Sequence, residues 1–227
     1  MRTKFIVSTL TGIIVLCSSC LNLYQPVFSE NELIRNDVIV GDWKSGNKLI
    51  HIEPYSTSRI AEITNIQIGA SNENKLTDRE KDSINFSKTY VLSYSFHQSV
   101  YYYSFEFGLA GKSFFAQLMP LARIPEDQRD TESRYNAFTG GEVLGTYGIA
   151  RVDFSEKNKL TLEFIDGEKV REKILNGKAK IPYAYDEVFN NFLITAEGGE
   201  LVKLLDKYGN DERIYSSEHS YHCTKSQ

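Results

Sequence analysis

Residues 89–119 read TYVLSYSFHQSVYYYSFEFGLAGKSFFAQLM, and the predicted architecture is built on this segment. Over two runs of it, every second residue is large and apolar, while Ser, Thr, His and Glu hold most of the positions between. A period of two residues is typical of a β-strand with one buried face and one wet face. Short links at residues 97–100 and 109–112 turn the chain back on itself. The stretch therefore predicts a three-stranded antiparallel meander.

Similar short runs of Val, Ile, Tyr and Phe, broken by Gly, Asn, Asp and Ser, continue on both sides of the meander. The candidate strands are residues 38–43, 48–53, 59–68, 89–97, 100–109, 112–119, 143–154 and 159–164, with a closing strand within 211–223. Amphipathic helices are predicted at 167–176 and 198–208, each ending at a glycine. We expect a mainly β fold with two short helices, either an antiparallel meander barrel or a sandwich.

The first twenty residues are typical of an export signal. Two basic residues precede an apolar run at 5–16, and two serines precede Cys20. This order resembles the lipobox of bacterial lipoproteins, although Cys17 stands where Leu is usual. In those proteins cleavage leaves the cysteine as an acylated N-terminus. The resemblance implies lipidation of Cys20 and attachment to a membrane.

Other interpretations of this segment compete with the lipobox. A transmembrane anchor needs about 20 apolar residues, and a run extended to Leu23 includes several Ser, Thr and Asn residues. Secretory cleavage after Ser19 would leave Cys20 as a plain thiol. Cleavage before Cys17 would place Leu16 where a small residue is needed.

The lipoprotein interpretation divides the chain into three parts. Residues 1–19 are the signal peptide, residues 20–36 are a linker from the lipid anchor, and residues 37–227 are a single β-rich domain. The expected location is the cell envelope, in the outer membrane. Some surface-exported lipoproteins carry an acidic run just after the cysteine. No such run follows Cys20, so the resemblance favours the periplasmic side over the cell surface.

Cysteine count and charge exclude some classes of protein. Of the three cysteines, only Cys223 would stay a thiol after cleavage and acylation, so no disulfide framework is available. The chain has 26 basic and 30 acidic residues, and loss of Arg2 and Lys4 takes the net charge from −4 to about −6. Nothing in this balance favours nucleic acid, which normally requires a basic patch.

The run Asp-Val-Ile-Val-Gly-Asp-Trp, which ends in Gly41-Asp42-Trp43, resembles the Gly-x-Trp opening of lipocalin-like barrels. That resemblance implies packing roles for Gly41 and Trp43, with the tryptophan closing the barrel base. Residues 105–120, 164–181 and 192–208 are similar to a group of uncharacterised lipoproteins of Gram-negative bacteria. The closing element that recurs in that group reads Leu193-Ile194-Thr195-Ala196 followed by Lys207-Tyr208-Gly209 in this chain. No activity comes with either resemblance.

Candidate chemistry is sparse. His219, His222 and Cys223 lie within five residues, but a zinc site needs further ligands, and a solvated tail is the simpler interpretation. His51 and His97 fall in predicted strands, where exposed or hydrogen-bonded histidines are common. The carboxylates Glu53, Glu62 and Glu106 would support glycosidic chemistry only if two of them came together. No nucleophile elbow or phosphate loop appears. We assign no catalytic residue, metal or cofactor.

Three functions stay open. The first is a binding module in which aromatic residues of the meander hold a small apolar or amphipathic ligand. Its candidate contacts are Tyr90, Tyr94, Tyr101, Tyr103 and Phe105. The second is a scaffolding lipoprotein that docks onto an envelope protein through exposed aromatics such as Tyr102. The third is a hydrolase acting on envelope material.

Overall fold

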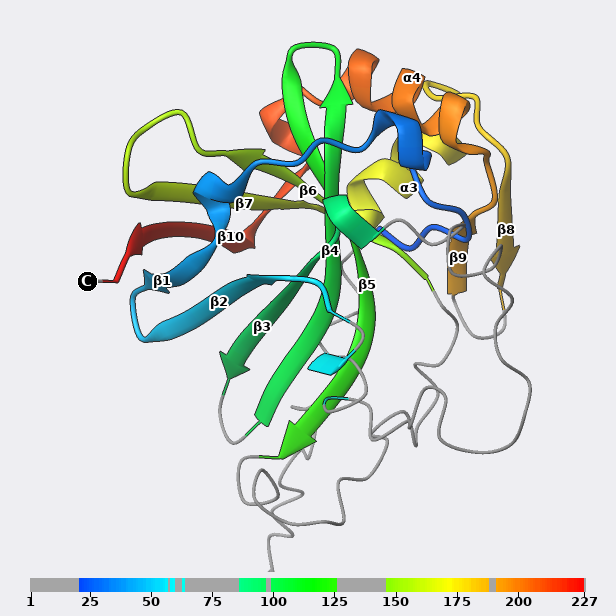
Figure 1. Ribbon diagram of the computed structural model, residues 1–227. Coiled ribbons are helices and arrows are strands. Elements are labelled where there is room, and N and C mark those ends of the chain that lie inside the picture. The colour runs from blue at the N-terminus through cyan, green and yellow to red at the C-terminus, as the bar shows by residue number, and fades with distance from the viewer. Residues whose placement is uncertain are drawn as a thin grey trace, which may run out of the picture.

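The computed structural model describes residues 21–56, 58, 59, 63, 86–96, 99–125, 146–187 and 191–226, which build an eight-stranded antiparallel β-barrel (Figure 1). The wall strands are β1 (Gly41–Ser45), β2 (Lys48–Pro54), β3 (Tyr90–Phe96), β4 (Ser99–Ala110), β5 (Ser113–Pro125), β6 (Gly148–Asp153), β7 (Lys159–Ile165) and β10 (Tyr215–Lys225). Each wall strand pairs with the next along the chain, and β10 pairs with β1 to close the barrel. The expected mainly β fold with two short helices is confirmed as a closed, lipocalin-like barrel rather than a sandwich.

An insertion separates the last two wall strands. Between β7 and β10 lie α3 (Gly167–Leu175), a two-stranded sheet of β8 (Tyr183–Asp186) and β9 (Asn191–Ile194), α4 (Gly198–Tyr208) and the 3-10 turn η5 (Glu212–Ile214). Asp166 caps α3 by accepting hydrogen bonds from the Glu168 and Lys169 backbone N–H groups. Both helices and β8–β9 gather on one side of the barrel (Figure 1). The two helices were predicted, whereas β8 and β9 were not.

Strand alternation fills the barrel with large side chains. Trp43, Tyr90, Phe105 and Phe107 are each at most 1% exposed and belong to one interior core. The Tyr90 ring stacks on the Phe107 ring with centroids 6.0 Å apart. Burial of several such rings, each removing about 150–250 Å² from water, stabilises the fold without a disulfide.

A second core lies outside the barrel wall. Phe115 of β5 and Ile149 of β6 point outward but are buried, because α3 and α4 cover them. Val170 and Ile174 come from α3, and Leu201 and Leu205 from α4. The wall strands at this side are therefore buried on both faces, which a simple in-and-out alternation does not predict.

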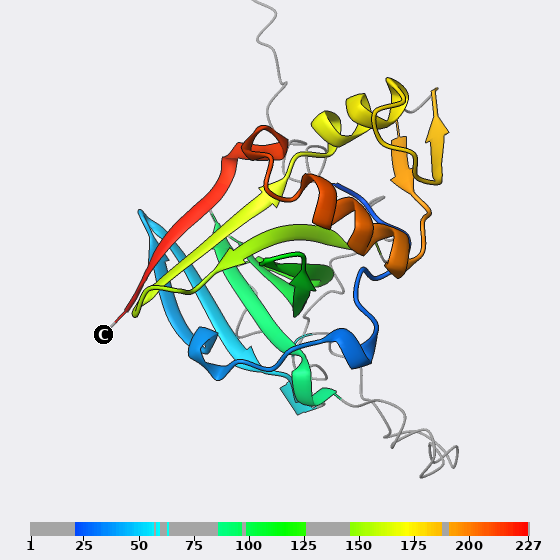
Figure 2. The same cartoon turned by 90° about the horizontal axis from the view of Figure 1, so that it is seen from above.

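Residues 21–40, which we call the strap, pack against the barrel instead of spacing it from a membrane. Leu21 and Leu23 are 1% and 0% exposed, and Phe28 is 2% exposed. The strap contains the 3-10 turns η1 (Glu30–Glu32) and η2 (Asp37–Ile39). Figure 2 shows the strap in blue: it starts beside α4 and continues along the lower edge of the barrel in this view, away from α3 and η5. The sequence predicts a linker at 20–36 and a domain starting at residue 37, whereas in the structure residues 21–36 pack against the barrel, because apolar side chains at irregular spacing are buried there one at a time.

Other boundaries shift by a few residues. The first predicted strand, 38–43, divides into η2 and β1, and the closing strand 211–223 divides into η5 and β10. Of the predicted strand 59–68, only Arg59 and Ile63 lie within the described residues, and Ile63 packs outside the wall on Val91. The predicted strand 143–154 appears as β6, its first three residues lying outside the described part.

Candidate functional site

One end of the barrel, which carries the β4–β5 and β6–β7 turns and which we call the base, is closed by the strap. The Trp43 indole Nε1 donates a hydrogen bond to the Ile39 carbonyl oxygen at 2.7 Å. The Lys225 ammonium lies 5.2 Å from the centre of the Trp43 ring. Gly41 has a φ of 128°, so a residue without Cβ permits the turn from the strap into β1. Gly41 and Trp43 thus lie where the chain enters the barrel base.

Tyrosines gather toward the other end, and we call Tyr94, Tyr101, Tyr103, Phe164 and Tyr221 the tyrosine cluster. Tyr94 faces Tyr101 across the β3–β4 pair, with ring centroids 6.4 Å apart. The Tyr221 ring lies edge-on to Tyr94 at 5.7 Å and to Phe164 at 6.0 Å. All but Tyr221, which is 8% exposed, are half-buried. The interior aromatic face is therefore sealed at the base and partly accessible at this end.

A cationic group adjoins the tyrosine cluster. Lys48 opens β2, and its Nζ lies 4.7 Å from the Tyr221 ring centre and 6.0 Å from that of Tyr94. Lys44 on the paired strand β1 is exposed, and it alternates with Trp43, whose ring fills the interior. The β1–β2 hairpin thus places one lysine against the interior aromatic rings and another on the outer surface.

The tyrosine hydroxyl at the centre of the cluster is neutral at physiological pH. Burial, with the neighbouring Tyr221 as a further cause, raises the pKa of Tyr94 far above its usual value. The cluster therefore offers aromatic faces and neutral hydroxyl groups beside the Lys48 ammonium. Such a surface suits a ligand with an apolar part and a polar or anionic end.

The five predicted ligand contacts share the barrel interior but divide by depth. Tyr94, Tyr101 and Tyr103 belong to the tyrosine cluster. Tyr90 and Phe105 are 1% and 0% exposed among other interior side chains, and the Tyr90 hydroxyl is engaged by the strap, accepting from the Asn36 N–H at 2.9 Å. Alternation identified the shared face. How deeply each residue is buried depends on which end of the barrel is closed, and alternation along a strand does not predict that.

Lys48, Phe164 and Tyr221 were missed by sequence reasoning. Tyr221 alternates with His219 and Cys223 on β10, and Phe164 alternates with Leu162 on β7. A period-two reading of residues 219–223 would have placed Tyr221 on an inner face. The position of Lys48 at this face follows from its alternation with Ile50 and Ile52.

The histidines near the end of the chain separate. His219 is buried, and its Nδ1 lies 2.9 Å from the Ser216 Oγ in the irregular start of β10. His222 is exposed and its Nδ1 lies 3.4 Å from the Thr161 Oγ1. Cys223 is a buried thiol in the interior core. Among the residues that the structure describes, no three His, Cys, Asp or Glu side chains could hold a metal ion.

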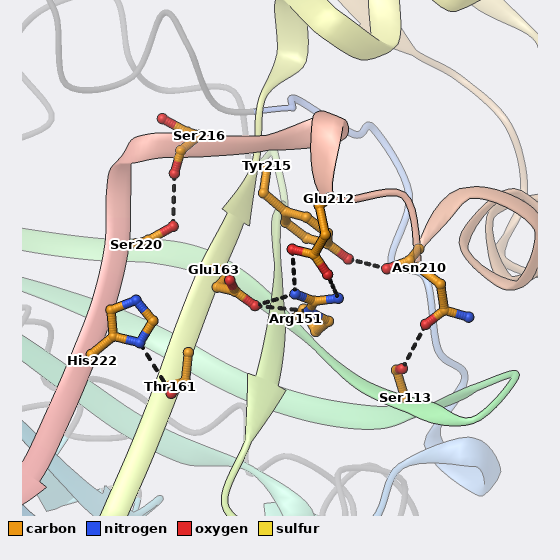
Figure 3. A network of polar contacts seen from close by, with 11 residues as sticks. Ser113, Arg151, Thr161, Glu163, Asn210, Glu212, Tyr215, Ser216, Ser220 and His222 are labelled. Carbon is orange, nitrogen blue, oxygen red and sulfur yellow. Dashed lines mark hydrogen bonds and ion pairs between the residues drawn. The ribbon is translucent and has the colours of Figure 1, made fainter.

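An ionic network on the outer wall has a structural role. Arg151 of β6 donates to Glu163 of β7 at 2.8 Å and to Glu212 of η5 at 2.8 and 3.0 Å (Figure 3). Its guanidinium lies 4.4 Å from the Tyr215 ring centre. The Tyr215 hydroxyl in turn donates to the Gly209 carbonyl oxygen. These contacts fasten η5 and the end of α4 to the wall.

Glu53 and Glu106, two of the carboxylates considered for glycosidic chemistry, form hydrogen bonds with different partners. Glu106 accepts from Thr89 and Gln117, each at 2.7 Å. Glu53 accepts from the Arg59 Nε at 2.7 Å and lies near His51, whose Nδ1 is 2.7 Å from the Asp42 Oδ1. The structure does not bring Glu53 and Glu106 into one pair.

Cys20, the predicted signal peptide, His97 and Glu62 lie outside the described residues. No described helix has the length and apolar composition needed to cross a bilayer. A small apolar pocket lies between α3, α4 and Leu21, with room for little more than one water molecule, so it is no ligand site. Comparison of the chain with protein-family models, curated proteins and solved structures finds no match.

Proposed function

We propose that this protein is a membrane-anchored binding protein, rather than an enzyme, and that an amphiphile seats its apolar part against the tyrosine cluster. The observation that carries the proposal is the gradient of burial along one continuous aromatic face. Tyr90 and Phe105 near the base are sealed, whereas Tyr94, Tyr101 and Tyr103 on the same strands keep accessible ring surface. Barrels of about eight strands commonly bind ligands at such an end.

The chemistry of the cluster suggests the kind of amphiphile. Aromatic faces contact a hydrocarbon chain without requiring a hydrogen-bond pattern. The Lys48 ammonium beside Tyr221 favours a ligand whose polar end carries negative charge. A single-chain carboxylate or phosphate amphiphile combines both features.

Attachment to the membrane belongs to the same proposal. The lipobox-like order before Cys20 supports acylation there, with the folded part on the envelope side of the bilayer. Two or more acyl chains would make that attachment stable, since one chain alone anchors only reversibly.

Binding of a fluorescent long-chain fatty acid, cis-parinaric acid, tests the site. We expect Tyr103→Ala to weaken binding about tenfold, which corresponds to about 1.4 kcal/mol. Tyr102→Ala is the matched control, because Tyr102 lies between two cluster residues but packs outside the wall beside Val91 and Leu121. Equal affinities for the two variants would contradict the site.

The charge preference has its own matched pair. We expect Lys48→Glu to weaken binding of the anionic probe about tenfold, and Lys44→Glu on the outer face of the same hairpin to leave it within twofold. A long-chain alcohol should bind the two variants alike. Loss of affinity for the anionic probe in Lys44→Glu alone would contradict a role for Lys48.

A second candidate, docking onto an envelope protein, is favoured by one observation. Among the described strands, β8 pairs only with β9, and its residues are mostly exposed, including Tyr183 at 43%. An exposed edge strand can add a strand from a partner. Tyr102 does not serve this role, because it is half-buried with Tyr55 and Leu121.

A further inference from the structure

The chain enters the fold at the end of the barrel that carries the tyrosine cluster. The Leu21 N–H donates to the carbonyl oxygen of Ile165, the last residue of β7, at 3.3 Å. Leu23 exchanges two backbone hydrogen bonds, of 3.0 and 2.9 Å, with Tyr147, the residue before β6. The end of β7 and the start of β6 both lie opposite the base.

Only the thickness of one strand separates this entry point from the cluster. Phe164 belongs to the cluster and contacts Tyr221 from inside the barrel. Ile165, the next residue, points to the outer core and holds Leu21. Neighbouring residues of a strand face opposite sides of the sheet.

The residues that follow Cys20 are held against the barrel wall. Leu21 is 1% exposed and Leu23 is 0% exposed, so residues 21–23 are fixed to the wall. An acyl group on Cys20 would begin one residue before Leu21, within about 4 Å of its Cα along the chain. A lipid anchor at that point holds the barrel itself at the bilayer surface.

We propose that the barrel sits on the membrane with its tyrosine end toward the bilayer and its base toward the aqueous phase. This inference rests on the proposed function, because it uses Cys20 as the anchor. The strap runs from the tyrosine end to the base, so the sealed base lies at the far side from the anchor (Figure 2).

The rim at the tyrosine end carries groups that suit a bilayer surface. Leu49, beside Lys48 in β2, is 52% exposed, and Lys44 is exposed on the same hairpin. Glu212 of η5 and Glu218 near the start of β10 are exposed, so the rim is not uniformly basic. Seating therefore depends on the acyl anchor and on apolar contact more than on anionic lipid.

Two leucines of nearly equal exposure mark the opposite ends of the barrel. Leu49 is 52% exposed at the tyrosine end, and Leu109 is 48% exposed beside the β4–β5 turn at the base. Leu49→Trp and Leu109→Trp place one reporter at each end. The natural Trp43, 1% exposed at the base, gives the same background in both variants.

The experiment uses the lipidated protein in vesicles of phosphatidylcholine, with or without bromine near the top of the acyl chains. Bromine quenches tryptophan on contact, so we expect the added fluorescence of Leu49→Trp to fall at least twofold and that of Leu109→Trp to change by less than a tenth. Without vesicles, acrylamide should quench both added tryptophans equally. Lys44→Trp and Lys112→Trp form a second pair, in case either leucine variant folds poorly.

Stronger bromine quenching at Leu109 than at Leu49, equal quenching of the two, or no quenching of either while the protein sediments with vesicles would overturn the orientation and leave the anchor standing. A protein that does not sediment with vesicles overturns both. Ligand binding is scored separately with the Tyr103→Ala variant, so a failure of the tyrosine site is distinguishable from a failure of the orientation.

Discussion

At the scale of single residues, Gln117 shows how a polar side chain holds the strap to the wall. Gln117 of β5 is 2% exposed, and its Oε1 accepts from the Phe28 N–H at 2.9 Å. Its Nε2 donates to Glu106 at 2.7 Å. A buried amide with partners on both sides is satisfied, and removing it leaves those partners without a bond.

We expect Gln117→Leu to lower the free energy of unfolding by about 2–3 kcal/mol, because the Phe28 N–H loses its acceptor and the Glu106 carboxylate loses a donor. Denaturant unfolding measures the change. Ser113, on the same strand as Gln117, makes an exposed hydrogen bond to Asn210, and Ser113→Ala should lower the free energy of unfolding by less than about 0.5 kcal/mol. Equal costs would show that Gln117 does not hold the strap.

Cys223 makes a second residue-scale prediction. Its thiol is 2% exposed, and burial raises the pKa of Cys223 to about 11, while a hydrogen bond from Ser45 has a smaller opposing effect. The native protein should therefore not react with a disulfide reagent at pH 8. In denaturant one thiol per lipidated chain should react. Two reactive thiols would show that Cys20 carries no acyl group.

The same thiol contributes a pH dependence. The unfolded thiol loses its proton near its usual pKa of about 8.5 and the folded thiol only near 11. The stabilisation is therefore complete below about pH 8.5 and is lost as the pH rises toward 11. We expect the unfolding free energy to fall more steeply with pH in the natural protein than in Cys223→Ala between pH 8.5 and 10.5. Parallel slopes would contradict the raised pKa.

Among the elements, those with a periodic sequence could be predicted, and those without a period could not. Period two over residues 89–119 predicted β3, β4 and β5, and amphipathic spacing with terminal glycines predicted α3 and α4. The strap has no period, because Leu21, Leu23 and Phe28 are buried at uneven spacing by different partners. The short strands β8 and β9, of four residues each, are at the lower limit of the length at which a period is recognisable.

Close packing of the strap on β4 makes an element-scale prediction. A Cβ added at Gly108 would lie 2.7 Å from the Phe28 Cδ1 and 3.0 Å from the Glu32 carbonyl oxygen. We expect Gly108→Ala to destabilise the fold by about 1–3 kcal/mol, as overpacking usually does. Unfolding curves of Gly199→Ala, at a helical glycine with open space around it, should show no loss. A double variant, Gly108→Ala with Phe28→Ala, that loses less stability than the sum of the two single variants would locate the clash at the Phe28 ring.

For the molecule as a whole, two hydrophobic cores stabilise different parts of the fold. The interior core fills the base of the barrel, and the outer core joins the strap, α3 and α4 to β5, β6 and β7. Sequence alternation predicts the interior core, because each strand contributes in turn. The outer core and the position of Lys48 beside the cluster depend on which strands become neighbours, and this is decided by barrel closure rather than by local pattern.

Attachment through Cys20 is testable for the whole molecule. We expect Cys20→Ser to move the protein from the membrane fraction to the soluble fraction without change in its unfolding curve, because the described fold begins after that residue. Fractionation followed by circular dichroism measures both properties. Retention of the variant in the membrane with an intact N-terminus would indicate an uncleaved membrane helix instead.

Native mass spectrometry of the protein extracted from its membrane tests the central claim, an acyl-anchored barrel that holds an amphiphile at its tyrosine end, most directly. The expected spectrum shows a chain that begins at acylated Cys20 and carries one bound amphiphile, which is lost in Tyr103→Ala and kept in Tyr102→Ala. A chain that still begins at Met1, or an acylated chain from which no amphiphile is released, would contradict the account.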